Sequence, residues 1–194
     1  MSTIWLVPEE TGQPGDQPVP SSRGAGRAKS KSSRKKRATR RNLRYWMVVT
    51  SLDNYRRTQE RGFTIQGFKT RYRKRVEAMK AGDRLLFYVT GRMAFAATCT
   101  LTSGVLEDHA PVWRSVHREE DYPWRVRIHP DAVLDEHEWL PAKELAYRLE
   151  YVRKWPPEHW TLAFQGPLHQ LPQRDFKLIE DEMRRLERSR PAAS

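Results

Sequence analysis

Aromatic and cationic side chains are interleaved in one short segment of the sequence. Within it Tyr72 is surrounded by five cations in seven residues. A ring in a cationic groove can stack on a nucleobase, which contributes about 1–3 kcal/mol per base, while the cations bind phosphates. The spacing therefore predicts a contact with a nucleic-acid backbone made by Lys69, Arg71, Arg73, Lys74 and Arg75.

Tryptophan is the second residue type whose chemistry suits nucleobases. The chain has seven tryptophans, an unusually high number for 194 residues. Some must be buried in the core, and the others are candidates for stacking on a base. Six fall in the folded part of the sequence: Trp46, Trp113, Trp124, Trp139, Trp155 and Trp160.

Residues that could support catalysis lack the patterns that catalysis needs. No pair of the six histidines has the i, i+4 spacing of a helical metal site, and the sequence has neither a glycine-rich phosphate loop nor a nucleophile elbow. The acid and lysine of Asp175-Phe176-Lys177 have a nuclease-like spacing but fall in an amphipathic helix. Cys99 lies in an apolar run and is expected to be a small buried hydrophobe. These observations argue against an enzyme.

The net charge points to a polyanionic partner. Lys and Arg number 36 against 24 Asp and Glu, which gives a formal charge of +12 and a pI near 10.1. Residues 1–41 carry +7 of this charge and are rich in Pro, Gly and Ser, so residues 1–42 are predicted to be a disordered basic arm. The arm is interpreted as a phosphate-binding tail, a nuclear signal in a eukaryotic host, or a solubilising leader.

Short apolar segments argue against export and membrane insertion. The run Ile4-Trp5-Leu6-Val7 is too short for a signal peptide, and no stretch approaches the roughly 18–20 apolar residues of a membrane span. We expect a soluble cytoplasmic protein, associated with the nucleoid, or a nuclear one if the host is eukaryotic.

The elements that must position these residues follow from the hydrophobic pattern. Ser51 is expected to cap a helix over 52–61, which Gly62 ends in a left-handed conformation. Further helices are expected after Pro141 and Pro172. The predicted strands are 45–51, 84–90, 94–101, 124–128 and 132–134. This order predicts an α+β fold with a small curved or barrel-like sheet and peripheral helices.

The order of several short motifs resembles one known family. The motifs are Tyr45 to Ser51, Gly62 to Phe68, Met79 to Asp83 with Leu86-Phe87-Tyr88, and Trp160 to Gly166 with Asp175-Phe176. Together they resemble an EVE domain, a member of the PUA-like superfamily that is akin to the YTH readers of methylated adenine in RNA. The resemblance runs from about Leu43 to Leu186, so a domain is expected over 43–187, followed by a flexible tail over 188–194.

The resemblance implies a PUA-like small mixed β-barrel that binds nucleic acid without a metal or cofactor. It implies a pocket for one flipped base carrying a modification, either a modified cytosine or N6-methyladenine, with DNA favoured over RNA, and a restriction or defence protein as a partner. Carried over residue by residue, the pocket consists of Thr50, Ser51, Asn54, Phe63, Thr64, Ile65, Gln66 and Trp113. The sequence departs from the family pattern at Gln66-Gly67-Phe68 and Tyr72, where a more polar stretch is expected.

Three other functions remain open at this point. They are RNA binding by a PUA-like domain, protein interaction without base recognition, and enzymatic action on nucleic acid. If a base is recognised, a buried methyl group contributes only about 0.8 kcal/mol, which corresponds to roughly a fourfold preference. Most of the affinity must then come from stacking and phosphate contacts.

Overall fold

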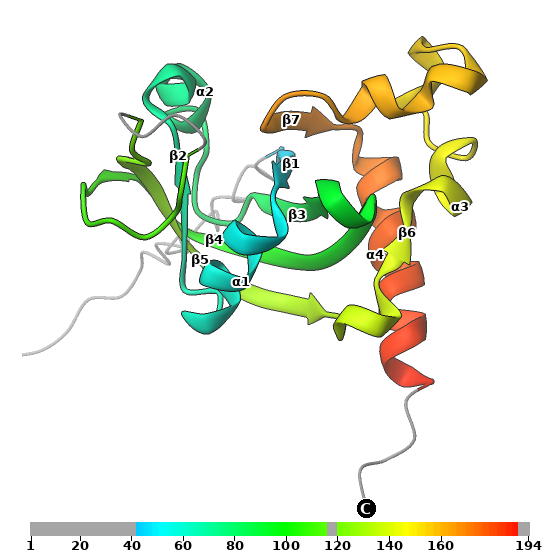
Figure 1. Cartoon of the computed structure of the whole chain (residues 1–194), viewed down its shortest axis with the longest axis horizontal. Coiled ribbons are helices and arrows are strands. Elements are labelled where there is room, and N and C mark those ends of the chain that lie inside the picture. The colour runs from blue at the N-terminus through cyan, green and yellow to red at the C-terminus, as the bar shows by residue number, and fades with distance from the viewer. Residues whose placement is uncertain (1–41, 116–119, 190–194) are drawn as a thin grey trace, which may run out of the picture. The chain divides into compact units, whose positions relative to one another are not determined.

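The computed structural model describes residues 42–115 and 120–189 of the chain (Figure 1). The predicted basic arm up to residue 41 and residues 190–194 of the predicted tail lie outside the described residues. The strands are β1 Tyr45–Thr50, β2 Ile65–Phe68, β3 Arg84–Val89, β4 Ala94–Glu107, β5 Trp124–Val133, β6 Leu140–Pro141 and β7 Leu168–Leu171. The α-helices are α1 Leu52–Glu60, α2 Arg73–Val76, α3 Ala142–Ala146 and α4 Gln173–Arg188. Short 3₁₀ helices span Thr70–Tyr72, Thr90–Arg92, Glu136–Glu138, Val152–Lys154 and Pro157–Phe164.

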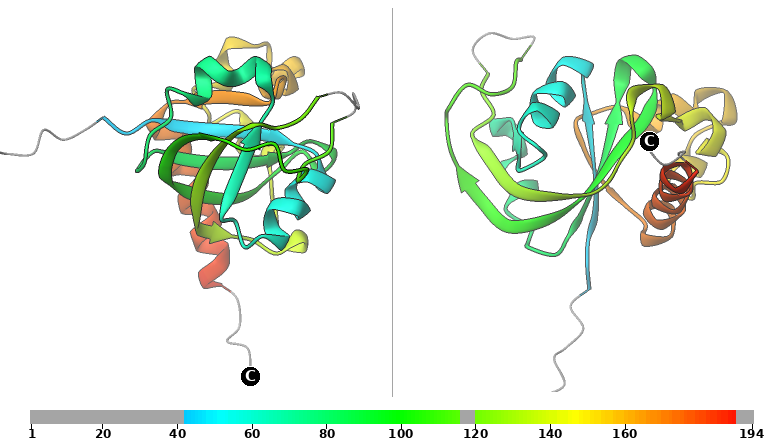
Figure 2. Two further views of the ribbon diagram at one scale, coloured as in Figure 1. Left: turned by 90° about the vertical axis from the view of Figure 1, so that its left-hand side faces the viewer. Right: turned by 90° about the horizontal axis from the view of Figure 1, so that it is seen from below.

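The strands of the described residues form one mixed, seven-stranded sheet. Its order is β2-β5-β4-β3-β1-β7, and β6 pairs with β4 beside this path. β1 and β3 pair in parallel, with Val48 opposite Phe87, while the other pairs are antiparallel. The register shifts twice between β4 and β5, and such bulges increase the local bend of a strand. Figure 2 shows these two long strands curling round α1, so the predicted small mixed barrel with peripheral helices is confirmed as a curled half-barrel.

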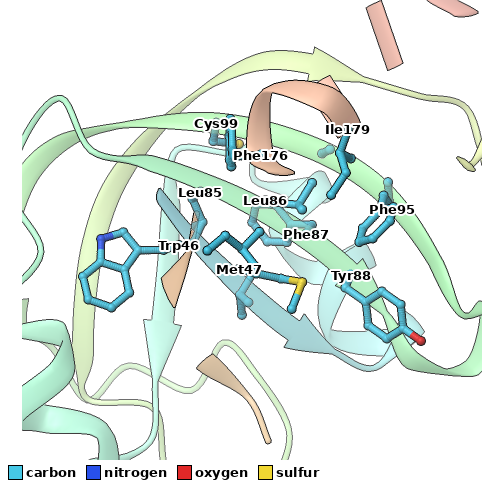
Figure 3. Packing of buried hydrophobic residues seen from close by; sticks show 14 of the residues in the cluster. Trp46, Met47, Leu85, Leu86, Phe87, Tyr88, Phe95, Cys99, Phe176 and Ile179 are labelled. Carbon is cyan, nitrogen blue, oxygen red and sulfur yellow. The ribbon is translucent and has the colours of Figure 1, made fainter. Parts of the chain in front are cut away.

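The core extends over both faces of the sheet. Five consecutive residues of β3, Leu85 to Val89, are buried, which is the pattern of a strand covered on both sides. Phe87 faces α1, where its ring centroid lies 5.8 Å from that of Tyr55. Tyr88 faces the opposite way and stacks on Phe164 with centroids 4.6 Å apart. Figure 3 shows buried side chains of β1, β3 and β4 together with Phe176 and Ile179 of α4. The last helix is therefore a core element, as its apolar spacing predicts.

Local signals mark the beginning of the domain correctly. Ser51 caps α1 by accepting a hydrogen bond from the Asn54 amide at 3.3 Å, and Gly62 has a φ of +60° after the helix. The sequence predicts two strands where β5 runs without interruption to Val133. Pro130 lies at a bulge in the pairing of β5 with β4. A proline is tolerated at a bulge, so the strand continues past it. The segment Trp160 to Phe164 forms part of a 3₁₀ helix.

None of the described helices is both long and apolar enough to cross a membrane.

Candidate nucleic-acid interface

A cavity of about 210 Å³ lies where β1 ends, α1 begins, β2 passes and the loop after β4 returns. Pockets for drug-sized ligands are roughly 300–1,000 Å³, so this volume suits a single ring system rather than an extended ligand. We call it the base cavity. It is lined by Val48, Val49, Thr50, Ser51, Asn54, Gln66, Gly67, Phe68, Lys69, Arg71, Tyr72, Trp113, Arg114, Tyr122 and Pro167.

Trp113 is held in the base cavity by a glycine and by a hydrogen-bond chain. A Cβ atom on Gly67 would lie 2.2 Å from Cζ3 of the Trp113 ring, so only glycine allows the indole to approach β2 this closely. The indole N–H donates to Thr58 Oγ1 at 2.9 Å, and the Thr58 hydroxyl lies 3.1 Å from Gln66 Oε1. From β5, the guanidinium carbon of Arg125 lies 5.3 Å from the Trp113 ring centroid. The ring is thus fixed before any ligand arrives.

The Asn54 side chain of helix α1 forms hydrogen bonds with the loop that carries Trp113. Its side-chain Oδ1 accepts from the Arg114 amide at 2.7 Å, and its Nδ2 donates to the Arg114 carbonyl at 2.8 Å. The Tyr122 hydroxyl donates to the same carbonyl at 3.2 Å, and burial raises the pKa of this phenol so that it remains a donor. Because both ends of the Asn54 amide are engaged by the loop, Asn54 positions the cavity wall.

The structure brings five of the eight predicted pocket residues together. Thr50, Ser51, Asn54, Gln66 and Trp113 line the base cavity. The other three do not. Phe63 has a φ of +52° and turns inward, where its ring contacts Tyr55 and Phe87 in the core. The exposed Thr64 donates its hydroxyl to the Arg61 carbonyl at 2.9 Å, and Ile65 is half-buried on β2.

Sequence reasoning missed the contribution of Tyr122 and Gly67. Tyr122 belongs to an irregular loop 68 residues beyond Asn54 in the sequence, and only its pairing with Asn54 shows where it lies. Gly67 did carry a usable signal, because an isolated glycine within a strand often marks close approach of another group.

The predicted backbone-binding cations do not form one patch. Lys69 and Arg71 line the base cavity, but Lys69 Nζ lies 2.5 Å from Glu120 Oε2 and 2.8 Å from Ser115 Oγ. These hydrogen bonds and the Lys69 charge lower the pKa of Glu120, so the carboxylate remains charged and cancels the cation. The Arg71 guanidinium is further away, at 3.9 Å from Glu120 Oε1.

The remaining three predicted cations point elsewhere. Arg73 bonds Glu77 at 2.8 Å and lies over the Trp124 ring at 4.5 Å. Lys74 and Arg75 line neighbouring hollows instead of the base cavity. The physical reason is that the segment forms a 3₁₀ turn followed by α2, and a helix sends successive side chains in different directions.

The residues considered for catalysis have structural roles. Asp175 is buried and accepts hydrogen bonds from the amides of Glu150 and Tyr151 at 3.0 and 2.7 Å, while Phe176 is buried in the core. Cys99 is fully buried, and burial raises the pKa of its thiol, which disfavours the reactive thiolate. Among residues 42–115 and 120–189, no group of three His, Cys, Asp or Glu side chains could hold a metal ion.

Comparison with known proteins places these features in a family context. The sequence pattern of the EVE domain family matches residues 44–181. A UPF0310 protein of Pyrococcus abyssi is 25% identical over 147 residues, which cover 71% of this chain and 98% of that protein.

Several solved structures share the fold. The Mmi1 YTH domain has a TM-score of 0.56 at 12% identity, covering 76% of this chain and 79% of that one. The Pho92 YTH domain in complex with m6A has a TM-score of 0.55 at 13% identity, with coverage of 74% and 84%. The YTH domain of Zygosaccharomyces rouxii MRB1 protein, in complex with N6-methyladenosine RNA, has a TM-score of 0.51 at 16% identity, with coverage of 73% and 87%.

Proposed function

Because this chain belongs to the EVE domain family, with the family pattern matched over residues 44–181, we propose that it binds nucleic acid and receives one extruded, modified base in the base cavity. The observation that carries the proposal is the pre-fixed indole of Trp113 at the wall of a cavity of about 210 Å³. A ring that is already immobilised loses little further entropy when a base stacks on it. The protein acts as a binding module in this proposal.

The energetics favour a base that is extruded easily. Unstacking and unpairing cost a few kcal/mol, least for a base that is already single-stranded or mismatched. Stacking contributes about 1–3 kcal/mol per base, which offsets much of that cost. A methyl group buried against the apolar part of the wall, at Val48, Val49 or Phe68, adds about 0.8 kcal/mol. The base cavity therefore suits a small uncharged modification, such as that of 5-methylcytosine or N6-methyladenine.

The type of nucleic acid is a separate part of the proposal. The family resemblance favours DNA, whereas the YTH domains that share the fold include complexes with RNA. The shared fold therefore supports RNA as the second candidate for the nucleic acid that this chain binds. A single-stranded target is common to both, because extrusion is then least costly.

Phosphate contacts at the cavity rim are assigned to exposed cations that have no carboxylate in direct hydrogen-bond contact. Arg114 and Arg71 line the base cavity and are exposed, and Arg71 is only loosely paired with Glu120, at 3.9 Å. Lys69 is a weaker contributor because Glu120 neutralises it.

The test is binding of the full chain to a panel of matched oligonucleotides. Each carries no modification, one 5-methylcytosine or one N6-methyladenine, in DNA and RNA forms. We expect one modified member to bind at least about fourfold more tightly than its unmodified match. Equal affinity across the panel would contradict base recognition, and binding that does not weaken with salt would favour a protein-interaction module. Conversion of any oligonucleotide, visible as a change in mass, would favour an enzyme.

A further inference from the structure

Two further hollows adjoin the base cavity. The first, of about 530 Å³, shares Arg71, Tyr72 and Pro167 with the base cavity. The second, of about 490 Å³, shares Lys74, Arg75 and His169 with the first and ends at Arg44. We call the two hollows together the outer trough. Residues of the segments 71–78 and 165–170 line it, so a path leads from the cavity rim, at the carboxyl end of β1, along the strand to Arg44 at its amino end.

The outer trough is cationic. Arg44, Arg71, Lys74 and Arg75 line it, and none of the described residues that line it is Asp or Glu. Many other cations of the described chain are neutralised, for example Arg73 by Glu77 and Arg125 by Asp108. Among the described residues, Arg44, Lys74 and Arg75 have no carboxylate within ion-pair distance, whereas Arg71 lies 3.9 Å from Glu120, so the outer trough keeps a net positive charge.

Two arginines of the outer trough are held in place without losing their charge. Arg75 donates to the Leu168 carbonyl at 2.9 Å, and Arg44 donates to the Ala78 carbonyl at 3.0 Å. A guanidinium has five N–H donors, so one bond to a neutral carbonyl orients the group and leaves other donors for an anion. This arrangement is that of a pre-organised phosphate-binding site.

The part of the lining formed by residues 165–170 is neutral and fixed. The His169 ring is within hydrogen-bond distance of the Tyr151 hydroxyl, at 2.7 Å, and of the Gly166 carbonyl, at 2.8 Å. Burial lowers the pKa of His169, so the ring is neutral at pH 7 and adds no charge to the lining. The charge of the outer trough therefore rests on its Arg and Lys side chains.

The strand that carries an extruded base must leave the base cavity across its rim, and the two sides of the rim differ in charge. On the loop side the Glu120 carboxylate neutralises Lys69. On the Tyr72 side the rim opens into the uncompensated cations of the outer trough. Tyr72 lies at this junction, where its ring can stack on the neighbouring base.

We propose that the outer trough binds the sugar-phosphate backbone of a single nucleic-acid strand on one side of the extruded base. This inference rests on the proposed function, because it assigns the path of the same strand. The Arg44, Lys74 and Arg75 side chains hold phosphates, and Tyr72 stacks on the adjacent base.

A triple substitution tests the charge of the outer trough. We define the salt slope as the slope of the logarithm of the binding constant against the logarithm of the salt concentration. It is about −0.7 per phosphate contact on a single strand. Arg44→Gln, Lys74→Gln and Arg75→Gln together should make the slope shallower by about 2. The matched control, Arg174→Gln, Lys177→Gln and Arg188→Gln on α4, removes the same charge from exposed positions and should leave the slope nearly unchanged. An equal change in both triple variants would overturn the proposal.

A second measurement tests whether the strand leaves the base cavity on one side only. It uses the wild type and a double variant, so it remains informative if the triple variant does not fold. Oligonucleotides with the same central base are extended in either the 5′ or the 3′ direction. Extension on one side should strengthen binding to the wild type several-fold, and Arg44→Gln with Lys74→Gln should remove this increase. Equal increases on both sides would overturn the inference. A wild type without modified-base preference but with the one-sided increase would instead refute the proposed function and support the outer trough as a strand-binding surface.

Discussion

At the scale of single residues, Gly67 allows the Trp113 indole to approach β2. Gly67→Ala would place a Cβ atom 2.2 Å from the Trp113 ring, so the indole must move. We expect a loss of modified-base preference together with a destabilisation of about 1–3 kcal/mol, the usual cost of overpacking. Urea unfolding and oligonucleotide binding measure the two effects. Gly91→Ala is the matched control, because a Cβ atom there meets nothing within 4 Å; similar losses in both variants would refute the role of Gly67.

Glu120 is the residue that limits the charge at the cavity rim. Glu120→Gln should free Lys69 to bind a phosphate, which raises affinity for single strands and steepens the salt slope by about 0.7. The pKa of Glu120 is lowered in the folded state, so the pair contributes stability above the ordinary carboxyl pKa of about 4.3 and loses it as the pH falls through the lower folded value. Binding measured at several salt concentrations tests the effect of the substitution. An unchanged or weaker affinity would show that Lys69 does not bind the strand.

At the scale of elements, hydrogen bonds to Asn54, Arg57 and Thr58 hold the loop after β4 to α1. Asn54→Ala removes two hydrogen bonds to the Arg114 backbone and leaves a partly buried amide and carbonyl with fewer partners. We expect a stability loss of about 1–3 kcal/mol, faster amide exchange over residues 111–115, and weaker base preference.

Ser51→Ala provides the comparison for Asn54→Ala. It removes the cap of the same helix at a typical cost of about 1 kcal/mol and does not touch the loop. Faster exchange of the loop in both variants would indicate that α1 as a whole, and not Asn54, holds it.

The elements themselves differ in how far the sequence predicts them. β1, α1 and the β3–β4 hairpin follow from local signals, because Ser51 and Gly62 mark the helix ends and apolar runs mark the strands. The sequence does not predict β2, β6 and β7, since these short segments, Ile65–Phe68, Leu140–Pro141 and Leu168–Leu171, become strands only by pairing with β5, β4 and β1. The helix expected at Pro141 is only Ala142–Ala146, with Pro141 preceding it. Long-range pairing, which local propensity does not encode, accounts for these differences.

Local sequence signals also predict the lining of the base cavity only in part. Gln66 and Trp113 are predicted as pocket residues and do line it, whereas Phe63, three positions before Gln66, lies in the core. Phe63 adopts a left-handed conformation directly after Gly62, and this second positive φ reverses the direction in which the Phe63 side chain points. The sequence contains no signal for that reversal at a non-glycine residue.

At the scale of the whole molecule, we assign different roles to the positive charge of two parts of the chain. Residues 1–41 carry +7 of the net +12, and we expect them to take no part in the choice of a base. Within the described residues, the uncompensated cations of the outer trough lie beside the base cavity. In the proposed function, charge supplies affinity that is indifferent to base identity, while the cavity supplies selectivity.

The most direct test of base recognition is the ratio of affinities for a modified and a matched unmodified strand, measured for the wild type and for Trp113→Leu. We expect a ratio of about four or more for the wild type and close to one for Trp113→Leu, with an unchanged salt slope. Trp113→Phe, which keeps a ring, should be intermediate, and Trp155→Leu, a half-buried tryptophan outside the base cavity, should retain the wild-type ratio. A wild-type ratio that persists in a folded Trp113→Leu variant would contradict recognition of the base by this cavity.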